Sequence, residues 1–448
     1  LILAQKELTT KKAENIIEES IIPAMEEVGR LFESNQLQLP FVLRSSETAK
    51  KTLDLLSDHL TEQKYKGTVL LATVYGDVHD IGKNLSAIIF RNHGYHVIDI
   101  GVDRSAEEII DAVKTHQPDA VGLSGLLANS AIYFGTVLTL FEKNGFSLPV
   151  LCGGAALSRD YTQNYLAPLY RGAVYKADDA FDGIRFLKNL SPKKDKTPPF
   201  LSPPSPQTQS DPSPAPLFLQ QKRHFLHFSL RDLLPCLQKK RLFQIRWGLD
   251  SEKGEEELAY LLNQKELFKE IKGIYSSFSC RPDGETMELL SPQGRTITTL
   301  HFPRAATEGQ HCITDFFRKG KDRITLFLVT VGGAIAAEEK VLLKNDEYYH
   351  YFLLHGLGTE LAETAAACLN KQVNEKEGDS LRFGFGYPAC PDLTYQKTLC
   401  TLLGAEEIGV TTSPSFQLIP ELSTGGFMIH NEKAFYFPMG RKRSKDEN

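Results

Sequence analysis

Asp77 and His79 are the residues of this sequence whose types and spacing are best suited to chemistry. A neutral imidazole nitrogen is a good metal ligand, and a carboxylate on the other ring nitrogen fixes the tautomer and raises the basicity of the ring. The spacing Asp-x-His therefore predicts a metal site with one histidine ligand. The alternative is a solvated loop histidine beside an aspartate that starts a helix, and a motif this short does not decide between them.

The segments around this pair must position it. Val69–Val74 is a short apolar run bounded by glycines, which is typical of a buried parallel strand. A polar loop over Gly76–Asp80 follows, then a helical pattern over Ile81–Asn92 and a second apolar run over His96–Gly101. His79 is thus expected in a loop at the carboxyl end of a strand, where open α/β sheets bind their ligands.

The longer string GDVHDIGKN resembles the cobalamin-binding loop of the methionine synthase and corrinoid-protein family. The resemblance implies that His79 is the lower axial ligand of cobalt and that Asp77 is its hydrogen-bonded neighbour. The string GLSGLLANS, residues 122–130, resembles the family's second loop. It implies that Ser130 extends the pair into a triad and that Ser124 faces the nucleotide base of the cofactor. Either serine, taken alone, is equally consistent with a core hydroxyl.

The same resemblance implies further cofactor contacts from the loops at this edge of the sheet. The paired glycines 153 and 154 let the backbone approach a ligand closely, although they are also consistent with an ordinary turn. The remaining cofactor-binding positions that the resemblance implies are Gly76, Asp77, Val78, His79, Asp80, Gly82, Ser124, Ala128, Gly153, Gly154 and Ala180.

Composition bounds the class of protein. A chain of 448 residues suggests about two to four domains. The hydrophobic content of 41% and charged content of 24% are those of an ordinary soluble globular protein. The net charge of −5 gives no reason to expect nucleic acid as a partner, and no apolar run reaches the roughly 20 residues of a membrane span.

Cysteine usage and the start of the chain add two expectations. The seven cysteines are scattered with no Cys-x-x-Cys pair, which favours a reducing cytoplasm and argues against a structural zinc site. The chain begins at Leu1 rather than at methionine, which predicts a fragment of a longer protein.

The first 190 residues are expected to form two domains. Residues 1–62 show helical patterns, including Phe41–Leu60 after a break at Pro40, and predict a small antiparallel bundle; the resemblance implies a partial cap over the corrin. Residues 63–190 alternate strand and helix, which predicts a five-stranded doubly wound parallel sheet of the Rossmann or flavodoxin-like type. The candidate strands are Val69–Val74, Val97–Gly101, Ala120–Ser124, Val150–Gly153 and Ala173–Lys176, with helices Ala106–His116 and Ile132–Asn144 between them.

A linker and an α+β domain are expected next. Residues 191–222 hold nine prolines mixed with serine and glutamine, which predicts an extended, semi-rigid linker. Residues 223–448 mix the two kinds of pattern. The helical patterns are Glu255–Lys272 and Tyr348–Gln372, and the strand-like runs are Thr296–Phe302, Thr325–Val331, Gly426–His430 and Ala434–Phe437.

The string RFGFGYPACPDLTYQKTLCTLLGAEEIGV closely resembles the activation domain of cobalamin-dependent methionine synthase, which binds S-adenosylmethionine. The resemblance implies that Arg382 holds the ligand's carboxylate, a role suited to a bidentate guanidinium. It also places Tyr387, the aromatic pair Phe435 and Tyr436, and Glu363 near the ligand. The alternative is that Arg382 and Tyr387 only stabilise a turn.

Four positions depart from the family pattern. Gln38 replaces an aromatic residue over the cobalt, and Ala128 replaces a threonine that bonds the nucleotide tail. Lys239 stands where longer members have an aspartate for the ligand's amino group, and Phe435 stands where tyrosine is usual. These changes are expected to alter the cap and to weaken the binding of S-adenosylmethionine.

The resemblance implies the carboxyl-terminal half of a methyltransferase. Methylcobalamin would carry a methyl group from 5-methyltetrahydrofolate to homocysteine, with repair by S-adenosylmethionine and a flavodoxin-like or flavoprotein electron donor. The homocysteine and methyltetrahydrofolate modules, with their zinc, would lie upstream or in trans. The alternative is a corrinoid carrier of another methyltransferase system, which has no reason to carry residues 223–440. A cobalamin-dependent regulator would need a DNA-binding module, and no basic recognition helix is evident.

Overall fold

The computed structural model describes residues 1–34, 36–57, 59, 65–126, 128–154, 157–189, 222–306, 309–318 and 322–439. The chain divides into two compact units, and the first contains residues 1–204 together with Phe243–Glu255 and Lys340–Leu353. The predicted Pro-rich linker lies outside the described residues except at Lys222. No helix among the described ranges is both long enough and apolar enough to span a bilayer.

The amino-terminal segment is helical, as predicted. Its helices are α1 (Ile2–Glu7), α2 (Ala13–Ile16), α3 (Ile22–Glu33) and α4 (Leu39–Ser57), with a π-helical turn between α2 and α3. Pro40 lies in the first turn of α4, where its missing N–H has no helical partner to lose. The helix therefore begins at Leu39, two residues before the predicted start. Apolar side chains from α2, α3 and α4 form a shared core: Ala13, Ile16, Met25, Ala49 and Leu56.

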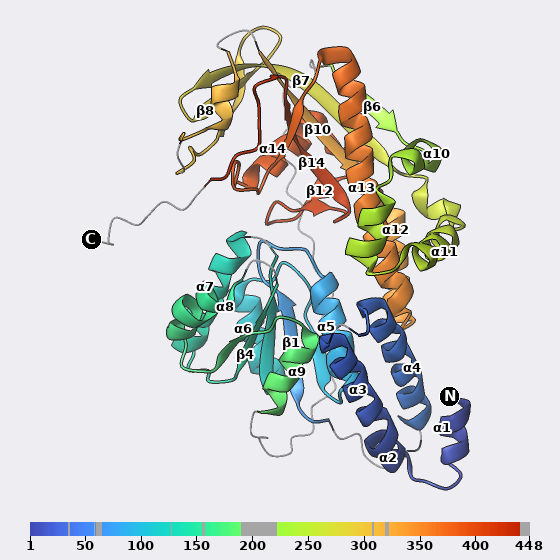
Figure 1. The fold of residues 1–448 in the computed structure, drawn as a ribbon. Coiled ribbons are helices and arrows are strands. Elements are labelled where there is room, and N and C mark those ends of the chain that lie inside the picture. Colours follow the sequence, from blue (N-terminus) through green and yellow to red (C-terminus); the bar gives the residue numbers. More distant parts are fainter. Residues whose placement is uncertain are drawn as a thin grey trace. The chain divides into compact units, whose positions relative to one another are not determined.

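The next segment forms a five-stranded sheet in which all neighbouring strands are parallel. The strand order is β2-β1-β3-β4-β5, so the order reverses between β1 and β3. The predicted doubly wound parallel sheet is thus confirmed (Figure 1). The strands are β1 (Thr68–Thr73), β2 (His96–Asp99), β3 (Ala120–Ser124), β4 (Val150–Gly153) and β5 (Val174–Lys176).

Helices cover both faces of this sheet. On one face α6 (Ala106–His116) and α7 (Ala128–Lys143) share a core with side chains of β1, β3 and β4. On the other face α5 (Ile81–Asn92) and α9 (Ala180–Lys188) share a second core with alternate side chains of the same strands. Because both faces are covered, the strands are continuous apolar runs, and this is why the sequence pattern located them well.

Residues 222–439 contain a seven-stranded antiparallel sheet with order β11-β14-β10-β7-β8-β9, and β6 pairs with β7. The predicted α+β class is confirmed. The strands are β6 (His224–His227), β7 (Lys272–Asp283), β8 (Thr286–Leu290), β9 (Thr296–His301), β10 (Arg323–Thr330), β11 (Leu381–Gly384) and β14 (Ser423–Ile429). The helices are α10 (Leu230–Leu233), α11 (Ser251–Leu262), α12 (Gly333–Lys344), α13 (Tyr348–Glu377) and α14 (Thr394–Leu403), and β12 (Thr411–Thr412) pairs with β13 (Leu418–Ile419).

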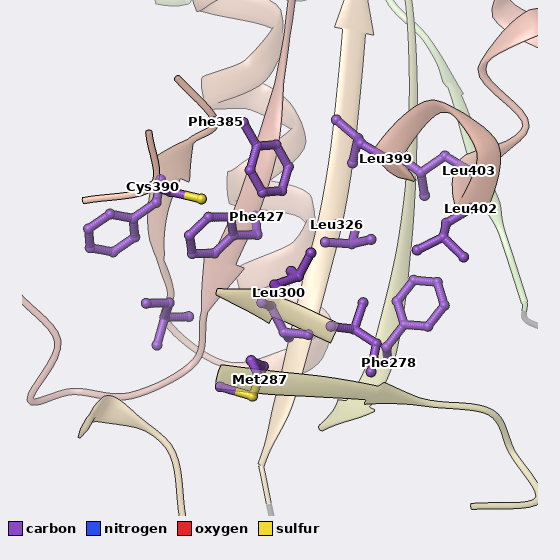
Figure 2. Close-up of a cluster of buried hydrophobic side chains, with 14 of the residues drawn as sticks. Phe278, Met287, Leu300, Leu326, Phe385, Cys390, Leu399, Leu402, Leu403 and Phe427 are labelled. Atoms are coloured by element: carbon purple, nitrogen blue, oxygen red, sulfur yellow. The ribbon is translucent and has the colours of Figure 1, made fainter. Parts of the chain in front are cut away.

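One face of this sheet packs against α14. Figure 2 shows the cluster, with Leu399, Leu402 and Leu403 of α14 near Phe278 and Leu326 of the sheet. On the opposite face lies α13, because the hydroxyls of two strand residues, Ser277 and Thr325, bond the Glu377 carboxylate at its end. The sheet is therefore buried on both faces over its central strands.

Two of the element predictions in this part were wrong. The predicted helix Glu255–Lys272 ends at Leu262, a 3-10 turn follows over Lys265–Phe268, and Lys272 already belongs to β7. The run Ala434–Phe437 is not a strand. Its aromatic rings pack against Phe316 and His311, and the hydroxyl of Tyr436 bonds the backbone oxygen of Arg382, so no ladder forms.

Candidate cofactor-binding site

Asp77 is the centre of a buried hydrogen-bond cluster at the carboxyl edge of the parallel sheet. Its side chain is fully buried. Oδ1 lies 2.7 Å from Nδ1 of His79 and accepts the backbone N–H of the same residue at 3.0 Å. Oδ2 accepts the hydroxyl of Ser130 at 2.8 Å and the backbone N–H of Leu126 at 2.5 Å. The structure thus brings together the three side chains of the predicted triad.

The electrostatics of the cluster keep Asp77 ionised. Burial by itself would raise the pKa of this carboxyl, but the hydrogen bond and the charge of the His79 ring, with the backbone N–H groups of Leu126 and His79, hold the pKa below its ordinary value. A carboxylate is an acceptor only, so Nδ1 of His79 is the nitrogen that donates. Nε2 is then the nitrogen that a metal would take, and the ring is one-third exposed, with 33% of its side-chain area accessible.

The loop that carries His79 depends on glycine at its first position. Gly76 has φ of +86°, a left-handed conformation that favours glycine. Val78 and Asp80 are half-buried on either side of His79. Asp80 is the N-cap of α5, and its side chain makes no capping hydrogen bond. Gly82 is exposed, and a Cβ there would have open space around it, so its backbone is accessible to a ligand.

The loops after β3 and β4 approach each other through glycine. A Cβ on Gly154, whose φ is +111°, would lie 1.9 Å from the backbone oxygen of Gly125. No side chain fits between these two backbones, so the close approach of the loops requires glycine at position 154. Gly153 ends β4 and Ser124 ends β3, half-buried at the same edge of the sheet.

Two predicted contacts lie at the margins of this arrangement. Ala128 begins α7, and its side chain lies outside the described residues. Ala180 begins α9 after β5, at the sheet edge beyond β3 and β4, and it packs against the core beneath α5. The structure does not bring Ala180 to the Asp77 cluster.

The residues predicted for a second ligand gather around strand β11. Arg382 lies opposite Met428 of β14, and its Nη2 is 4.0 Å from the Glu363 carboxylate of α13. The backbone oxygen of Arg382 accepts the hydroxyl of Tyr436 at 2.8 Å. The guanidinium lies 5.9 Å from the centre of the Phe327 ring. The structure therefore places Arg382, Glu363 and Tyr436 in one neighbourhood.

Three aromatic side chains predicted for this ligand are exposed. The exposed fractions are 68% for Tyr387, 44% for Phe435 and 65% for Tyr436. Tyr387 also closes the turn to Cys390 through a backbone bridge, as the turn-stabilising alternative expects. That role uses only its backbone and leaves the ring available. Lys239 is exposed as well, and its backbone N–H bonds the oxygen of Leu237.

Three family models match the chain. The B12 binding domain model matches residues 67–185, and a second B12 binding domain model matches residues 2–57. The model for the activation domain of vitamin B12 dependent methionine synthase matches residues 251–447. The matches give this chain two B12 binding domains followed by an activation domain of the vitamin B12 dependent methionine synthase type. The order of domains expected from the sequence is the order of these matches.

Two curated relatives match this chain over nearly its whole length. The chain is 31% identical to methionine synthase of Mycobacterium tuberculosis (strain ATCC 25618 / H37Rv), over 96% of this chain and 44% of that protein. It is 30% identical to methionine synthase of Mycobacterium leprae (strain TN), with the same coverage of 96% and 44%. The chain therefore spans less than half the length of these relatives. A crystal structure of the MetH reactivation domain bound to AdoHcy matches with a TM-score of 0.46 and 19% identity, over 50% of this chain and 82% of that one.

The B12 binding domain over residues 67–185 fits a cobalt cofactor by the chemistry of its donors. One imidazole is held by a buried carboxylate that fixes its tautomer, and the ring emerges at the sheet edge where the strand order reverses. Near the ring, a Cβ built on Gly76 or on Gly82 would meet no atom within 4 Å, so there is open space beside both backbones. Among the described residues no group of three or more His, Cys, Asp or Glu side chains could hold a metal ion by itself. A single histidine suits a metal whose remaining ligands come with the cofactor.

Sequence reasoning missed two contributors to the Asp77 cluster. Leu126 contributes only its backbone N–H, a group that every non-proline residue has, so its side chain carries no signal. Asp103 follows β2 and bonds the loop of Gly76 and Asp77 through both its side chain and its backbone. No motif includes Asp103, and only the adjacency of β2 and β1 brings it to the site.

Proposed function

We propose that this chain is the cobalamin-binding and reductive-activation part of a methionine synthase. The whole enzyme would move a methyl group from 5-methyltetrahydrofolate to homocysteine through methylcobalamin, with repair by S-adenosylmethionine. The observation that carries the proposal is the Asp77–His79–Ser130 cluster on the same chain as the activation domain. A corrinoid carrier for another methyltransferase explains the cluster but not the activation domain.

The residues of the cluster have distinct tasks in this proposal. Cobalamin, when bound, supplies the cobalt centre that accepts and donates the methyl group. His79 presents Nε2 to the cobalt, while Asp77 Oδ1 orients the ring through Nδ1. The hydroxyl of Ser130 donates a hydrogen bond to Asp77 Oδ2 at 2.8 Å. This bond stabilises the negative charge of Asp77, which in turn holds the proton on Nδ1 of His79.

Arg382 is the proposed anchor for the carboxylate of S-adenosylmethionine. A guanidinium makes two parallel hydrogen bonds to a carboxylate. The Glu363 carboxylate, 4.0 Å from Nη2 of Arg382, orients the guanidinium but is too far away to form a close hydrogen bond with it. Tyr387, Phe435 and Tyr436 offer exposed rings on which the apolar part of the ligand can pack. Lys239 repels a ligand amino group and Phe435 lacks a hydroxyl, so binding is expected to be weaker than the family norm but present.

The partners follow from the same proposal. The homocysteine and methyltetrahydrofolate modules, with their zinc, would be on the same polypeptide or act in trans. A flavodoxin-like or flavoprotein donor would supply the electron for repair. The cytoplasm is the proposed location, because the seven cysteines are scattered along the sequence with no Cys-x-x-Cys pair.

Binding by the unmodified chain tests the proposed function. Titration with methylcobalamin should give a saturable complex with the visible spectrum of histidine-coordinated cobalt. Titration calorimetry with S-adenosylmethionine on the same chain should give measurable heat. A chain that retains no cobalamin after gel filtration would overturn the proposal. Cobalamin binding without any response to S-adenosylmethionine would favour the corrinoid-carrier alternative.

Asp77→Asn should preserve cofactor binding but weaken coordination by His79 about 10–100-fold. The amide lacks the charge that polarises the ring, and its NH2 group would oppose one of the donors now bonded to Asp77. The visible spectrum of bound methylcobalamin, followed against pH, measures the change. Ser130→Ala removes a single hydrogen bond and should have a smaller effect. Equal coordination and an unaltered pH dependence in Asp77→Asn would contradict the predicted triad.

A further inference from the structure

The loop that follows β2 lies against Thr73 and Val74, which come at the end of β1 and shortly before the His79 loop begins at Gly76. The backbone N–H of Thr73 bonds the oxygen of Gly101 at 3.0 Å, and the N–H of Arg104 bonds the oxygen of Thr73 at 3.0 Å. Val74 and Arg104 form a parallel bridge beyond the two named strands. The β2 loop therefore continues the sheet up to the point where the chain turns toward His79.

Asp103 in this loop makes two hydrogen bonds to the turn before His79. Its Oδ1 accepts the backbone N–H of Gly76 at 2.9 Å, and its own N–H donates to the backbone oxygen of Asp77 at 3.0 Å. Asp103 has φ of +54°, in the left-handed region, which is uncommon outside glycine and is best tolerated by Asn and Asp. A residue held there needs surrounding contacts to keep it, and such residues cluster at functional sites.

We propose that Asp103 is a positioning residue for the Asp77–His79 pair, an inference that rests on the proposed cobalamin-binding function. Gly76 has no side chain with which to anchor itself and adopts a left-handed φ of +86°. The side chain of Asp103 accepts the N–H of Gly76, the residue before Asp77, and the N–H of Asp103 donates to the backbone oxygen of Asp77 itself. The backbone of Asp77 is therefore held on both sides of its Cα. The clamp directs the carboxylate of Asp77 toward Nδ1 of His79.

Three variants of the full chain separate the hydrogen bond from the backbone conformation. Asp103→Gly keeps the left-handed conformation without strain but loses the acceptor for Gly76. Asp103→Asn keeps an oxygen acceptor and tolerates the same conformation. Gln117→Gly is the matched control, because Gln117 also has a positive φ, of +47°, and its N–H bonds Val113 within α6 rather than the His79 loop.

Hydrogen exchange of the cofactor-free chain gives the first readout. The peptide that spans residues 75–80 should exchange about twofold to tenfold faster in Asp103→Gly, the range expected for the loss of one hydrogen bond. Asp103→Asn should stay close to the unmodified chain. Gln117→Gly should change exchange at the end of α6 and leave residues 75–80 unaffected.

The visible spectrum of added methylcobalamin gives the second readout. The equilibrium for coordination by His79 should fall by the same twofold to tenfold in Asp103→Gly, with the Asn variant again near normal. Unchanged exchange and coordination in Asp103→Gly, or an equal change in Gln117→Gly, would overturn the positioning role. A full chain that binds no methylcobalamin defeats the proposed function, whereas normal binding by the unmodified chain with an unaffected Asp103→Gly defeats only this inference.

Discussion

Replacing His79 by glycine is expected to convert bound methylcobalamin from a histidine-coordinated to a base-off visible spectrum, while the sheet stays folded. The substitution removes the whole side chain of His79, Cβ and ring, and leaves the backbone of the loop in place. The loop keeps its backbone contacts, since the N–H of residue 79 bonds Asp77 Oδ1 at 3.0 Å and its oxygen accepts the hydroxyl of Thr73 at 3.4 Å. Coordination should therefore be lost without loss of the fold.

Two additions make this experiment decisive. Free imidazole, added to the His79→Gly variant, should restore the coordinated spectrum, because the space left by the ring faces the carboxylate of Asp77. His116→Ala is the matched control, since His116 lies at the end of α6 and no role is predicted for it. An unchanged spectrum in His79→Gly, with circular dichroism showing an intact fold, would remove His79 from the ligand role.

The parallel sheet could be predicted from the sequence almost residue by residue. Ala120–Ser124 and Val150–Gly153 were predicted with the bounds that the structure has, as were the helices Ile81–Asn92 and Ala106–His116. Each of these strands is buried on both faces, so its apolar run begins and ends where the strand does. The fold of this part therefore follows from local pattern and the rule for strand–helix alternation.

The antiparallel part could be predicted only in class. The strand β7 was not predicted, and its first residue, Lys272, was assigned to the end of the predicted helix Glu255–Lys272, although the helix ends at Leu262. Conversely, Ala434–Phe437 is a short aromatic run like that of a strand, but its rings pack against other aromatic side chains and its backbone joins no sheet. Short apolar runs do not distinguish these cases, because tertiary contacts decide them.

The candidate site divides in the same way. Asp77, His79 and Ser130 could be named because two motifs contain them, and the structure brings them within hydrogen-bonding distance, with Ser130 in the first turn of α7 rather than in a loop. Leu126 and Asp103 could not, because they act through backbone groups or through a neighbouring strand. The sequence shows which functional groups a side chain carries. The partner of a backbone N–H depends on which strands and loops are adjacent in the folded sheet, so it cannot be inferred from the residue type.

Arg382→Ala in the full chain is expected to weaken the binding of S-adenosylmethionine by roughly 30-fold or more. A carboxylate in a partly buried site needs a fixed cationic partner, and removing one side of such a pair typically costs about 2–5 kcal/mol. The side chain of Arg382 is 27% exposed and stands beside Glu363, so the loss would also leave that carboxylate facing the ligand. Titration calorimetry on the full chain measures the change.

The controls for Arg382 test geometry as well as charge. Arg382→Lys keeps the charge but loses the paired donors, so its affinity should fall between those of the unmodified chain and the alanine variant. Arg281→Ala removes an arginine of the same sheet that pairs with Glu288 at 3.0 Å, and it should leave binding unaffected. Equal affinity in Arg382→Ala would return Arg382 to a turn-stabilising role. If even the unmodified chain gives no heat at millimolar ligand, the domain keeps its α+β fold without the activation chemistry, which is the outcome that favours the corrinoid-carrier alternative.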